Sequence, residues 1–442
     1  MSKPVSLRQT SICVVAADIF LPVVTAFVEH SSLAFGLGKP EALKMMLASE
    51  ELFLHLCRVV IPKQGMIEVR CSCKGHIVQS DFSFPETRIN MHAFNLTALP
   101  RSSGTDDLDD MRMILASRSV DHLNIRRKEN QRIISLIKEK KYPKAVAKLE
   151  NPHPITCRDF AIQSPLPDEL KYFALLTARF YDQDDIPVFF QYPGMLVDMI
   201  DSGGYHAITA RGPAGEIGGG LVWRLLTDNT VEVFGPFVMV DDDRSRTVCV
   251  SLIEACISRA GRTSAVVMIC YPPESGQYTE YFEFLGRMNC YAITGALRQR
   301  SLWFRLMHED MGSAVWTTPE MDDFLQHAYR RLFLAREIRH VADQGESRNA
   351  YSVFSTQIDR LRRQVTLDIL WPGEDIEDNL MRHLDLFQKE GIRNIIFEID
   401  AGIAWKSEIM PCLLKNGFQP ILILPYAGTG DIIVFQLLHH PS

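Results

Sequence analysis

The sequence lacks the features of a membrane protein, a secreted protein or a nucleic-acid binder. No apolar run reaches the roughly 18–20 residues that a membrane-spanning helix needs. The first ten residues, MSKPVSLRQT, lack the charged-then-apolar pattern of a signal peptide. Basic residues are not in excess, since 47 Lys and Arg stand against 54 Asp and Glu and the formal net charge is −7. This balance argues against a dedicated nucleic-acid-binding protein.

The sequence also lacks a cysteine pattern that would bind zinc. Its ten cysteines are scattered, mostly inside apolar segments such as VVMIC and VCVSLIEACI. Cys71 and Cys73 form a C-x-C pair, but strand alternation puts both on one face, and no second Cys/His pair lies at zinc-finger spacing. We therefore expect no metal site. Buried free thiols in a reducing compartment, the cytoplasm, explain the cysteines best.

What the sequence does contain is an ordinary globular composition over a length that suits two to three domains. Of its 442 residues, 46% are apolar and 23% are charged. A basic and then proline-rich stretch at 140–154 is typical of a linker, and the polar stretch at 341–350 indicates a long loop. These breaks predict three domains, at residues 1–145, 151–308 and 309–442.

The first of these domains reads as helices on one side of a mixed sheet. Apolar residues at helical spacing predict helices over 18–37 and 39–61, after a strand at 8–16. Alternating residues at 66–84 predict a hairpin around Lys74-Gly75, and two further strands follow over 122–140. A helix with an acidic first turn is expected over 106–121. The pattern is an α+β sandwich.

The order of these elements and the EELF motif at 50–53 resemble the anti-sigma-factor serine kinase branch of the GHKL ATPases, which have the histidine-kinase-type ATP-binding fold. The resemblance implies that Glu51 is the catalytic glutamate and that His55 stands where the family has its magnesium-holding asparagine. It implies that SDFSFP (80–85) is the adenine-binding turn, with Gln79 and Asp81 as remnants of the ATP site. TDDLDDM (105–111) falls where the family has its glycine-rich phosphate lid.

Departures from the family motifs predict an impaired ATP site. A phosphate lid needs glycines so that backbone N–H groups can approach the oxygens, whereas the four aspartates within 106–110 would repel a triphosphate. Histidine suits softer metals than magnesium, which prefers oxygen ligands. The alternative for Glu51 and His55 is a weak side-chain contact one turn apart on an ordinary amphipathic helix.

The second domain resembles the GNAT acyltransferases in the order of its predicted strands and helices. In that fold a strand–loop–helix unit seats the pyrophosphate of acetyl-CoA on backbone N–H groups at a helix N-terminus. The resemblance places this loop at Arg244, Ser245, Arg246, Thr247, Val248 and Cys249, where Thr247 and Cys249 replace small residues of the family motif. The run GGG at 218–220 precedes a strand rather than a helix, so we interpret it as a turn or bulge.

The sequence offers no general acid at the family's tyrosine position and one candidate for the general base of an acetyltransferase. YFEFLG (281–286) aligns with the end of the family motif, within a helix predicted over 278–288, and puts Phe282 at the family's general-acid tyrosine. Phenylalanine has no proton to give. Glu232, on the predicted central strand, is the one candidate for a general base. Its alternative is an outward-facing residue of an alternating strand.

The third domain resembles a second GNAT half without the means to bind acetyl-CoA. Helices are expected over 319–338, 375–391 and 404–418, with strands over 350–370, 393–400 and 419–438. WPGEDIEDNL (371–380) carries acids where phosphate would sit, and Leu413 stands at the tyrosine position. YAGTG at 426–430 reads as a hairpin turn rather than a ligand loop.

The expected fold is therefore a multidomain α+β and α/β protein, a GHKL α/β sandwich followed by two GNAT-like mixed-sheet domains. The leading hypothesis is a cytoplasmic bacterial regulatory protein that acts mainly by binding proteins or ligands. Its resemblances imply a sigma factor or a STAS-type anti-sigma antagonist as partner, and a homodimer through the first domain. The alternatives are an N-acetyltransferase using acetyl-CoA in 151–308, and a residual ATP- and magnesium-dependent serine kinase.

Overall fold

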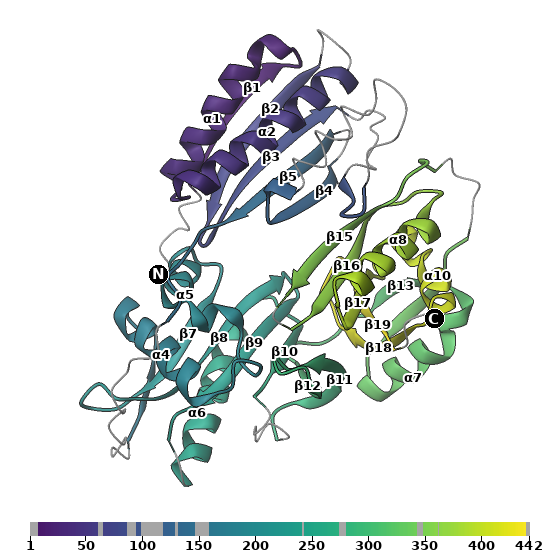
Figure 1. Ribbon diagram of the computed structural model, residues 1–442. Helices are drawn as coiled ribbons and strands as arrows, with labels where there is room; N and C mark the ends of the chain where they lie inside the picture. Colours follow the sequence, from purple (N-terminus) through teal and green to yellow (C-terminus); the bar gives the residue numbers. More distant parts are fainter. Residues whose placement is uncertain are drawn as a thin grey trace. The chain divides into compact units, whose positions relative to one another are not determined.

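The structure is a computed structural model that describes residues 8–60, 65–85, 94–98, 118–128, 131–145, 159–240, 243–273, 280–342, 348–360 and 362–438. The chain is a mixed α/β protein with several sheets (Figure 1). It divides into two compact units: residues 1–141 with 343–397, and residues 142–342 with 398–442. The three domains expected from the sequence remain a prediction, because this division groups the chain differently.

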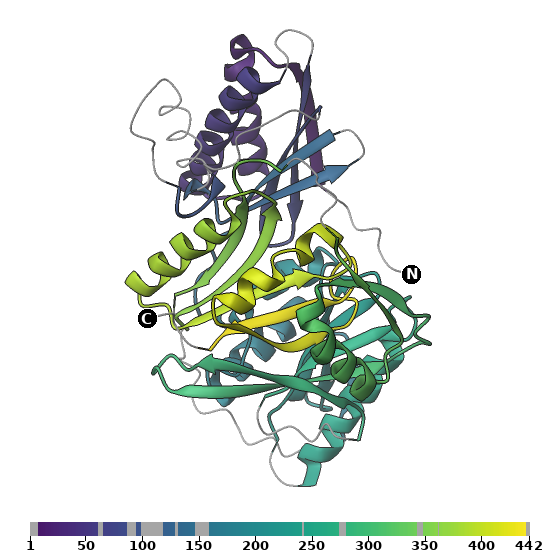
Figure 2. The ribbon, with the colours of Figure 1, turned by 90° about the vertical axis from the view of Figure 1, so that its right-hand side faces the viewer.

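The first unit begins with two helices packed on one face of a five-stranded sheet, and Figure 2 shows the two layers side by side. The strands lie in the order β1-β2-β3-β5-β4. Their bounds are β1 (Arg8–Val15), β2 (Met66–Lys74), β3 (Ile77–Pro85), β4 (His122–Lys128) and β5 (Gln131–Glu139). The helices are η1 (Asp18–Phe20), α1 (Leu21–Ala34) and α2 (Lys39–Val59).

All neighbouring strands in this sheet are antiparallel, so the expectation of a mixed sheet was wrong. The reason is local, because β2–β3 and β4–β5 are hairpins, and a hairpin can join only antiparallel strands. Gly75 supplies the left-handed residue of the first hairpin turn, with a φ of 62°. The predicted hairpin around Lys74-Gly75 is confirmed.

The core of this layer follows the periodicity of the sequence. Met45, Ala48, Leu52 and Leu56 of α2 recur every three or four residues and are all fully buried. On β3, alternate residues from Val78 to Phe84 point to the same side and are buried against the helices. Helical and strand periodicities therefore meet in one apolar interface.

The rest of the first unit consists of a hairpin and a helix from late in the chain. These are β15 (Val353–Asp359), β16 (Gln364–Trp371), α8 (Ile376–Lys389) and the start of β17 (Asn394–Asp400). Val353 belongs to the same buried cluster as the apolar face of α2, and Trp371 packs against that cluster. Residues about 300 positions apart thus share one core.

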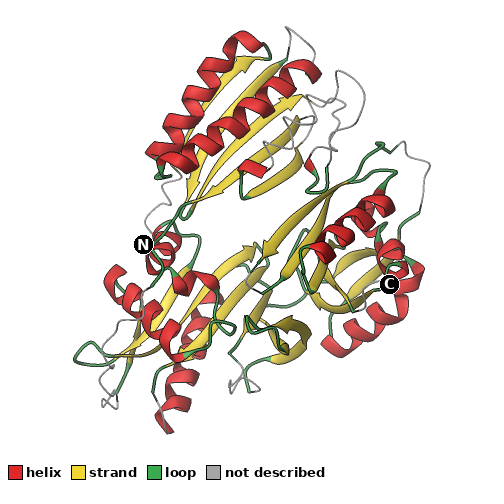
Figure 3. Cartoon of the chain, in the orientation of Figure 1, coloured by secondary structure: helices red, strands yellow, loops and turns green. Residues whose placement is uncertain are grey.

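The second unit contains a seven-stranded sheet in the order β11-β12-β10-β9-β8-β7-β6, drawn as arrows in Figure 3. Its strands are β6 (Ala161–Gln163), β7 (His206–Arg211), β8 (Ile217–Thr227), β9 (Thr230–Val238), β10 (Val267–Tyr271), β11 (Glu283–Tyr291) and β12 (Leu297–Leu306). Its helices are α4 (Pro167–Phe180), η3 (Val188–Gln191), α5 (Pro193–Asp201) and α6 (Asp243–Ala260).

Strands β9 and β10 form the parallel pair of this sheet and are joined by α6, whereas the other pairs are antiparallel. A parallel pair needs such a crossover connection. This is the strand–helix–strand unit that the GNAT resemblance implies. The unit places the N-terminus of α6 near the carboxyl end of β9, where open α/β sheets bind ligands.

The glycine run at 218–220 lies inside β8, and the register of β8 against β9 shifts just after Gly220. A Cβ atom on Gly220 would come within 2.8 Å of the Ile208 carbonyl oxygen and of the Phe173 ring. The glycines therefore permit close packing of α4 and β7 on β8. The interpretation as a bulge is confirmed.

The remaining elements of the second unit are a small parallel pair and the last strands of the chain. Their bounds are β13 (Ser313–Thr317), η4 (Pro319–Met321), α7 (Asp322–Leu332), β14 (Arg336–His340), α9 (Ala404–Ser407), α10 (Met410–Lys415), β18 (Phe418–Leu424) and β19 (Ile432–Leu437). The last sheet has the order β15-β16-β17-β19-β18, and the division between the two units falls inside β17.

This sheet repeats the strand order of the seven-stranded sheet. In both sheets the chain runs through a hairpin, a helix, a central strand and then two more strands. The last of these two strands lies next to the central strand, so the spatial orders are β8-β9-β10-β12-β11 and β15-β16-β17-β19-β18. Helix α6 follows the hairpin in the first set, and α8 follows it in the second. The expectation of a tandem pair of GNAT-like domains stays a prediction.

Three predicted helices differ from the structure. The helix expected over 278–288 is strand β11 from Glu283 onward. The helix expected over 319–338 stops at Leu332, because Phe333 adopts a left-handed conformation with φ 52°, and β14 begins three residues later. The helix expected over 404–418 is broken into α9 and α10, with Pro411 in the first turn of α10.

Within the described residues, no helix is both long enough and apolar enough to span a membrane. No disulfide joins the cysteines in this part of the chain. Five of them are buried, namely Cys57, Cys71, Cys249, Cys256 and Cys270.

Candidate functional site

The parallel pair β9 and β10 opens at its carboxyl end. The register joins Thr230 to Val267 and Phe234 to Tyr271, where β10 ends. Strand β9 continues to Val238, which lies opposite Gly219 of β8. The GNAT resemblance implies that backbone N–H groups on the side of β9 facing away from β8 would bind an acyl thioester.

A tyrosine hydroxyl occupies this side of β9. Tyr181, just after α4, accepts a hydrogen bond from the Val238 N–H at 2.7 Å and donates to the Val238 carbonyl oxygen at 3.0 Å. Because Met239 donates to the Gly218 carbonyl, Val238 itself points both backbone groups away from β8. Burial raises the pKa of Tyr181, so its hydroxyl stays protonated. The Tyr181 hydroxyl thus satisfies both backbone groups of Val238 on this side of β9.

The six residues predicted to form the pyrophosphate loop lie in the first turns of α6 rather than in a loop. Val248 and Cys249 are buried against the sheet, and burial raises the pKa of the Cys249 thiol to about 11. Arg246 is exposed and pairs with Glu280 at 2.6 Å. Arg244 and Ser245 are half-buried, and Thr247 is exposed. Their role in binding acetyl-CoA stays a prediction.

Glu232, the candidate general base, is 8% exposed and belongs to a buried polar cluster. Arg224 lies directly opposite on β8 and donates from Nε to Glu232 at 2.5 Å. Arg224 also donates to the Tyr205 hydroxyl at 2.9 Å, and burial raises the pKa of Tyr205. The Glu232 carboxylate is therefore held by the Arg224 guanidinium through a charge-assisted hydrogen bond.

Three aromatic residues lie near the Glu232 cluster or stand at or beside the general-acid position of the family motif. Phe282, at the position of the family's acid, is a buried core residue just before β11. Tyr281 donates to Glu254 at 2.9 Å near the surface. Tyr271, at the end of β10, is stacked on Phe234, with 5.8 Å between ring centroids. Burial, reinforced by the nearby Glu232 and Glu398, raises the Tyr271 pKa well above its ordinary value. Tyr271 is thus a protonated phenol near Glu232.

In the first unit, Glu51 and His55 are half-buried on α2, one turn apart, as the sequence predicts. SDFSFP, expected as an adenine-binding turn, instead forms the last six residues of β3, which pairs with β2 on one side and β5 on the other. The TDDLDDM segment at 105–111 lies outside the described residues. The turn expectation was wrong because residues 80–84 continue the alternation that begins at Val78.

The two residues assigned to the ATP-site remnant bond to each other. Gln79 donates to Asp81 at 2.6 Å, and Ser135 of β5 donates to the same carboxylate oxygen at 2.5 Å. Arg126 of β4 lies 3.6 Å from Asp81. This polar network crosses the sheet face opposite the helices and ties β3, β4 and β5 together. A role in binding adenine stays a prediction.

The YAGTG segment forms the turn between β18 and β19, as the sequence predicts. The carboxylate of Asp400 accepts hydrogen bonds from the backbone N–H groups of Gly402, Thr429 and Gly430, at 2.7–3.1 Å. These N–H groups are therefore used inside the protein rather than offered to a ligand. Leu413 is fully buried on α10.

No group of three or more His, Cys, Asp or Glu side chains among the described residues is arranged to hold a metal ion. No family model and no curated protein matches the sequence.

Solved structures resemble about one third of the chain. An aminoglycoside 6'-acetyltransferase type Ii is 12% identical with a TM-score of 0.27, over 34% of this chain and 98% of that one. A GNAT phosphinothricin acetyltransferase from Sinorhizobium meliloti, in complex with AcCoA, is 13% identical with a TM-score of 0.28, over 33% and 88%. Arabidopsis thaliana NAA60, in complex with a bisubstrate analogue, is 14% identical with a TM-score of 0.27, over 34% and 99%. At TM-scores this low, these likenesses assign no activity to the chain.

Sequence reasoning missed the residues that decide the chemistry of β9. Tyr181 lies 57 positions before Val238, and nothing local marks it as a partner. Arg224 could have been found to within one residue, because Arg224 and Glu232 flank the β8–β9 turn, although a register shift between Leu225 and Thr227 puts them at unequal distances from it. Tyr271 is marked only by its place at the end of an apolar strand.

Proposed function

We propose that this chain is a regulatory protein that acts by binding, and that its GNAT-like sheet in residues 159–306 does not transfer acyl groups. The observation that carries the proposal is the double hydrogen bond of the Tyr181 hydroxyl with the Val238 N–H and carbonyl groups. An acyl thioester would have to displace this hydroxyl from β9. Leaving a buried phenol without its partners costs about 1–3 kcal/mol, which opposes ligand binding.

The surroundings of β9 support the same proposal. Direct transfer of an acyl group to an amine needs a base that accepts a proton and an acid that returns one. The Glu232 carboxylate is held by Arg224, and Phe282 replaces the tyrosine of the family motif. These features support a GNAT-like scaffold that serves as a binding surface rather than as an acyltransferase.

The finer assignments belong to this proposal too. The EELF helix packed on an antiparallel sheet supports an anti-sigma-kinase-like first domain with an impaired ATP site around Glu51 and His55. Gln79 and Asp81 are bonded to each other, which leaves fewer polar groups for adenine. The partners that this resemblance implies are a sigma factor or a STAS-type anti-sigma antagonist, and a second copy of the chain.

Calorimetric titration of the full chain with acetyl-CoA and, separately, with Mg-ATP tests the proposal. We expect no binding heat for either ligand and no rise in melting temperature, because a ligand of the folded state would stabilise it. Micromolar binding of acetyl-CoA with turnover of an amine would overturn the binding-only assignment. Micromolar binding of Mg-ATP would overturn the impaired ATP site.

A second candidate is an N-acetyltransferase in residues 159–306. The observation that favours it is the opening between β9 and β10 after Phe234 and Tyr271. In this candidate, Tyr181 would swing away, Glu232 would activate an amine through water and Tyr271 would supply the proton. Transfer of an acetyl group that is lost in both Glu232→Gln and Tyr271→Phe would favour this candidate.

A further inference from the structure

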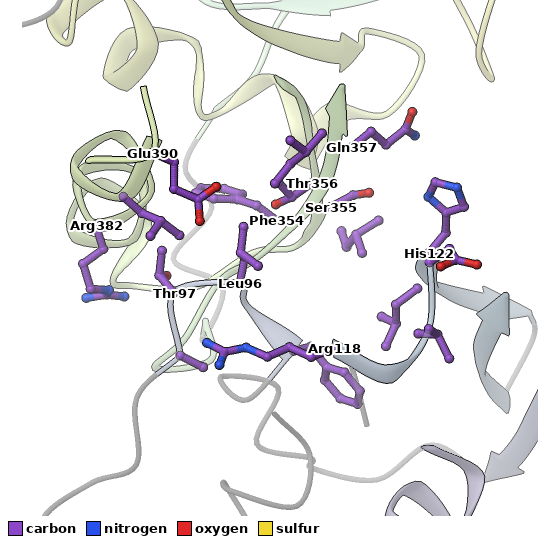
Figure 4. Close-up of a pocket in the computed structure, with 18 of the residues that line it drawn as sticks. Leu96, Thr97, Arg118, His122, Phe354, Ser355, Thr356, Gln357, Arg382 and Glu390 are labelled. Atoms are coloured by element: carbon purple, nitrogen blue, oxygen red, sulfur yellow. The ribbon is translucent and has the colours of Figure 1, made fainter. Parts of the chain in front are cut away.

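Strand β15 lies at one end of its sheet order, and one of its edges borders a cavity of about 1100 Å³ in the first unit (Figure 4). The other walls come from residues 94–98, from residues 118–123 and from α8. Figure 4 shows His122 across the hollow from Ser355 and Gln357, with Leu96 beside β15 and Thr97 closer to α8.

The cavity meets the edge of β15 rather than one of its faces. Five consecutive residues, 354 to 358, line it. Side chains of a strand alternate between the two faces of the sheet, so a cavity on one face would touch only every second residue. Consecutive lining residues therefore place the backbone edge of β15 along the cavity.

One side chain of the chain already pairs with this edge as a neighbouring strand would. The Asn95 carboxamide donates to the Ser352 carbonyl oxygen at 2.7 Å and accepts from the Phe354 N–H at 3.0 Å. A residue of an adjacent parallel strand would make these same two bonds, to residues i and i+2. Asn95 is 2% exposed, and Asn379 donates to its oxygen at 3.2 Å, so the carboxamide is fixed in place.

The next positions of the edge remain available. The register pairs Ser355 with Asp368 and Gln357 with Thr366, and the Phe354 N–H points the other way, to Asn95. Alternation therefore directs the N–H and carbonyl groups of Thr356 and Ile358 toward the cavity. Within the part of the chain that the structure describes, these four backbone groups have no hydrogen-bond partner.

We propose that this edge binds an extended peptide segment of a partner protein, which adds to β15 as a strand next to Asn95. Unpaired N–H and carbonyl groups at an edge are a template for another strand, and strand addition is a common way to bind peptides. The five lining residues of β15 span about 16 Å, the length of a five-residue strand. Leu96, Val120 and Leu123 give the cavity an apolar wall for side chains of the peptide.

Backbone pairing favours a peptide over a small ligand. The exposed groups form a row of alternating donors and acceptors, and the backbone of an extended chain presents the complementary row at the same spacing. The proposed regulatory function needs a place where a partner binds, and this site would supply it. It uses other residues than the acyl site, so the two proposals can fail separately.

Selection of random octapeptides displayed on phage against the full-length chain, with counter-selection on Thr356→Pro, tests the proposal. Proline removes the N–H that faces the cavity, and edge strands tolerate proline at such positions. Thr356→Val keeps this N–H and is the matched control. We expect selected peptides to bind wild type and Thr356→Val equally, and to bind Thr356→Pro about tenfold more weakly, the effect of one lost hydrogen bond.

Two further measurements make the outcome decisive. N-methylation of alternate residues in a selected peptide blocks its donors without altering its side chains, so it should abolish binding. In hydrogen exchange, the amides of Thr356 and Ile358 should exchange faster than those of Ser355 and Gln357 in the free chain, and should become protected by the peptide.

Slow exchange of Thr356 and Ile358 in the free chain would mean that the edge is already paired, by the chain itself or by a second copy, and would overturn the proposal. Failure to select any peptide that distinguishes wild type from Thr356→Pro would overturn it as well. If Thr356→Pro fails to fold, as judged by its melting temperature, the N-methylation and exchange results decide alone.

Discussion

Arg224 and Glu232 face each other across β8 and β9, and the guanidinium donates to the carboxylate at 2.5 Å. The carboxylate side chain is 10% exposed and the arginine side chain is 34% exposed. Glu232 is the residue that the sequence nominates as a general base, and that role stays a prediction. The pair connects two strands at the centre of the seven-stranded sheet, so a structural role follows directly from its geometry.

Glu232→Gln should lower the free energy of unfolding by about 1–3 kcal/mol, because it leaves the Arg224 charge without its partner in a partly buried site. Denaturation in urea measures the change. The double variant Arg224→Met with Glu232→Leu is the matched control and should regain most of the loss, since two apolar side chains can replace a buried pair. Wild-type stability in Glu232→Gln would contradict the structural role.

His383 should make stability depend on pH. It is fully buried on α8 between the rings of Phe354 and Phe387, and its Nδ1 bonds to the Asn379 carbonyl. Burial lowers the pKa of His383 from 6.5 to about 4. Between these two pH values the unfolded chain binds a proton that the folded chain does not, so stability falls as pH drops from 6.5 to 4, by at most about 3 kcal/mol.

The pH effect can be isolated by comparing unfolding curves at several pH values. The difference in free energy of unfolding between wild type and His383→Leu should change as the pH falls from 6.5 to 4, and it should stay constant above pH 6.5. His327→Gln, on the exposed side of α7, is the control and should keep the wild-type slope. If the free energy of unfolding of His383→Leu depended on pH as steeply as that of wild type, groups other than His383 would cause the pH dependence.

Tyr181→Phe should destabilise the second unit by about 1–3 kcal/mol, because it leaves the Val238 N–H and carbonyl groups without the buried hydroxyl. The ring would stay packed edge-on against Phe237, at 5.1 Å between centroids, so the loss reports on the hydroxyl. Tyr172→Phe, on the helix that precedes Tyr181 and 37% exposed, is the matched control and should be neutral. Equal stability of both variants would show that Tyr181 does not hold β9.

Asn95→Ala should destabilise the first unit by about 2–4 kcal/mol, since it removes two hydrogen bonds to buried backbone groups of residues 352 and 354. The Phe354 amide should exchange faster with solvent than in wild type. Asn416→Ala is the control, because among the described residues the Asn416 side chain bonds to Cys412 of the preceding helix and to no other residue. An unaltered Phe354 amide would contradict the pairing between Asn95 and β15.

The sequence by itself determined the elements whose signal is local. The period of α2, the alternation of β3 and the turn at Gly75 each depend on residues within a few positions of one another. The unit of β9, α6 and β10 was also readable, because an apolar strand, a helix and another strand in succession predict a parallel pair. Where the local signal was ambiguous, as at residues 278–288, the prediction of a helix was wrong.

Only the tertiary structure decided which polar groups meet. Asn95 and Ser352 are 257 positions apart, and Tyr181 and Val238 are 57 apart, so no periodicity connects them. Each pair forms because packing of apolar surfaces brings together backbone groups that must then be satisfied away from water. The same packing placed the Tyr181 hydroxyl on Val238 of β9 and left the edge of β15 facing a cavity. Hydrophobic patterns specify the elements, whereas long-range hydrogen bonds depend on how the elements assemble.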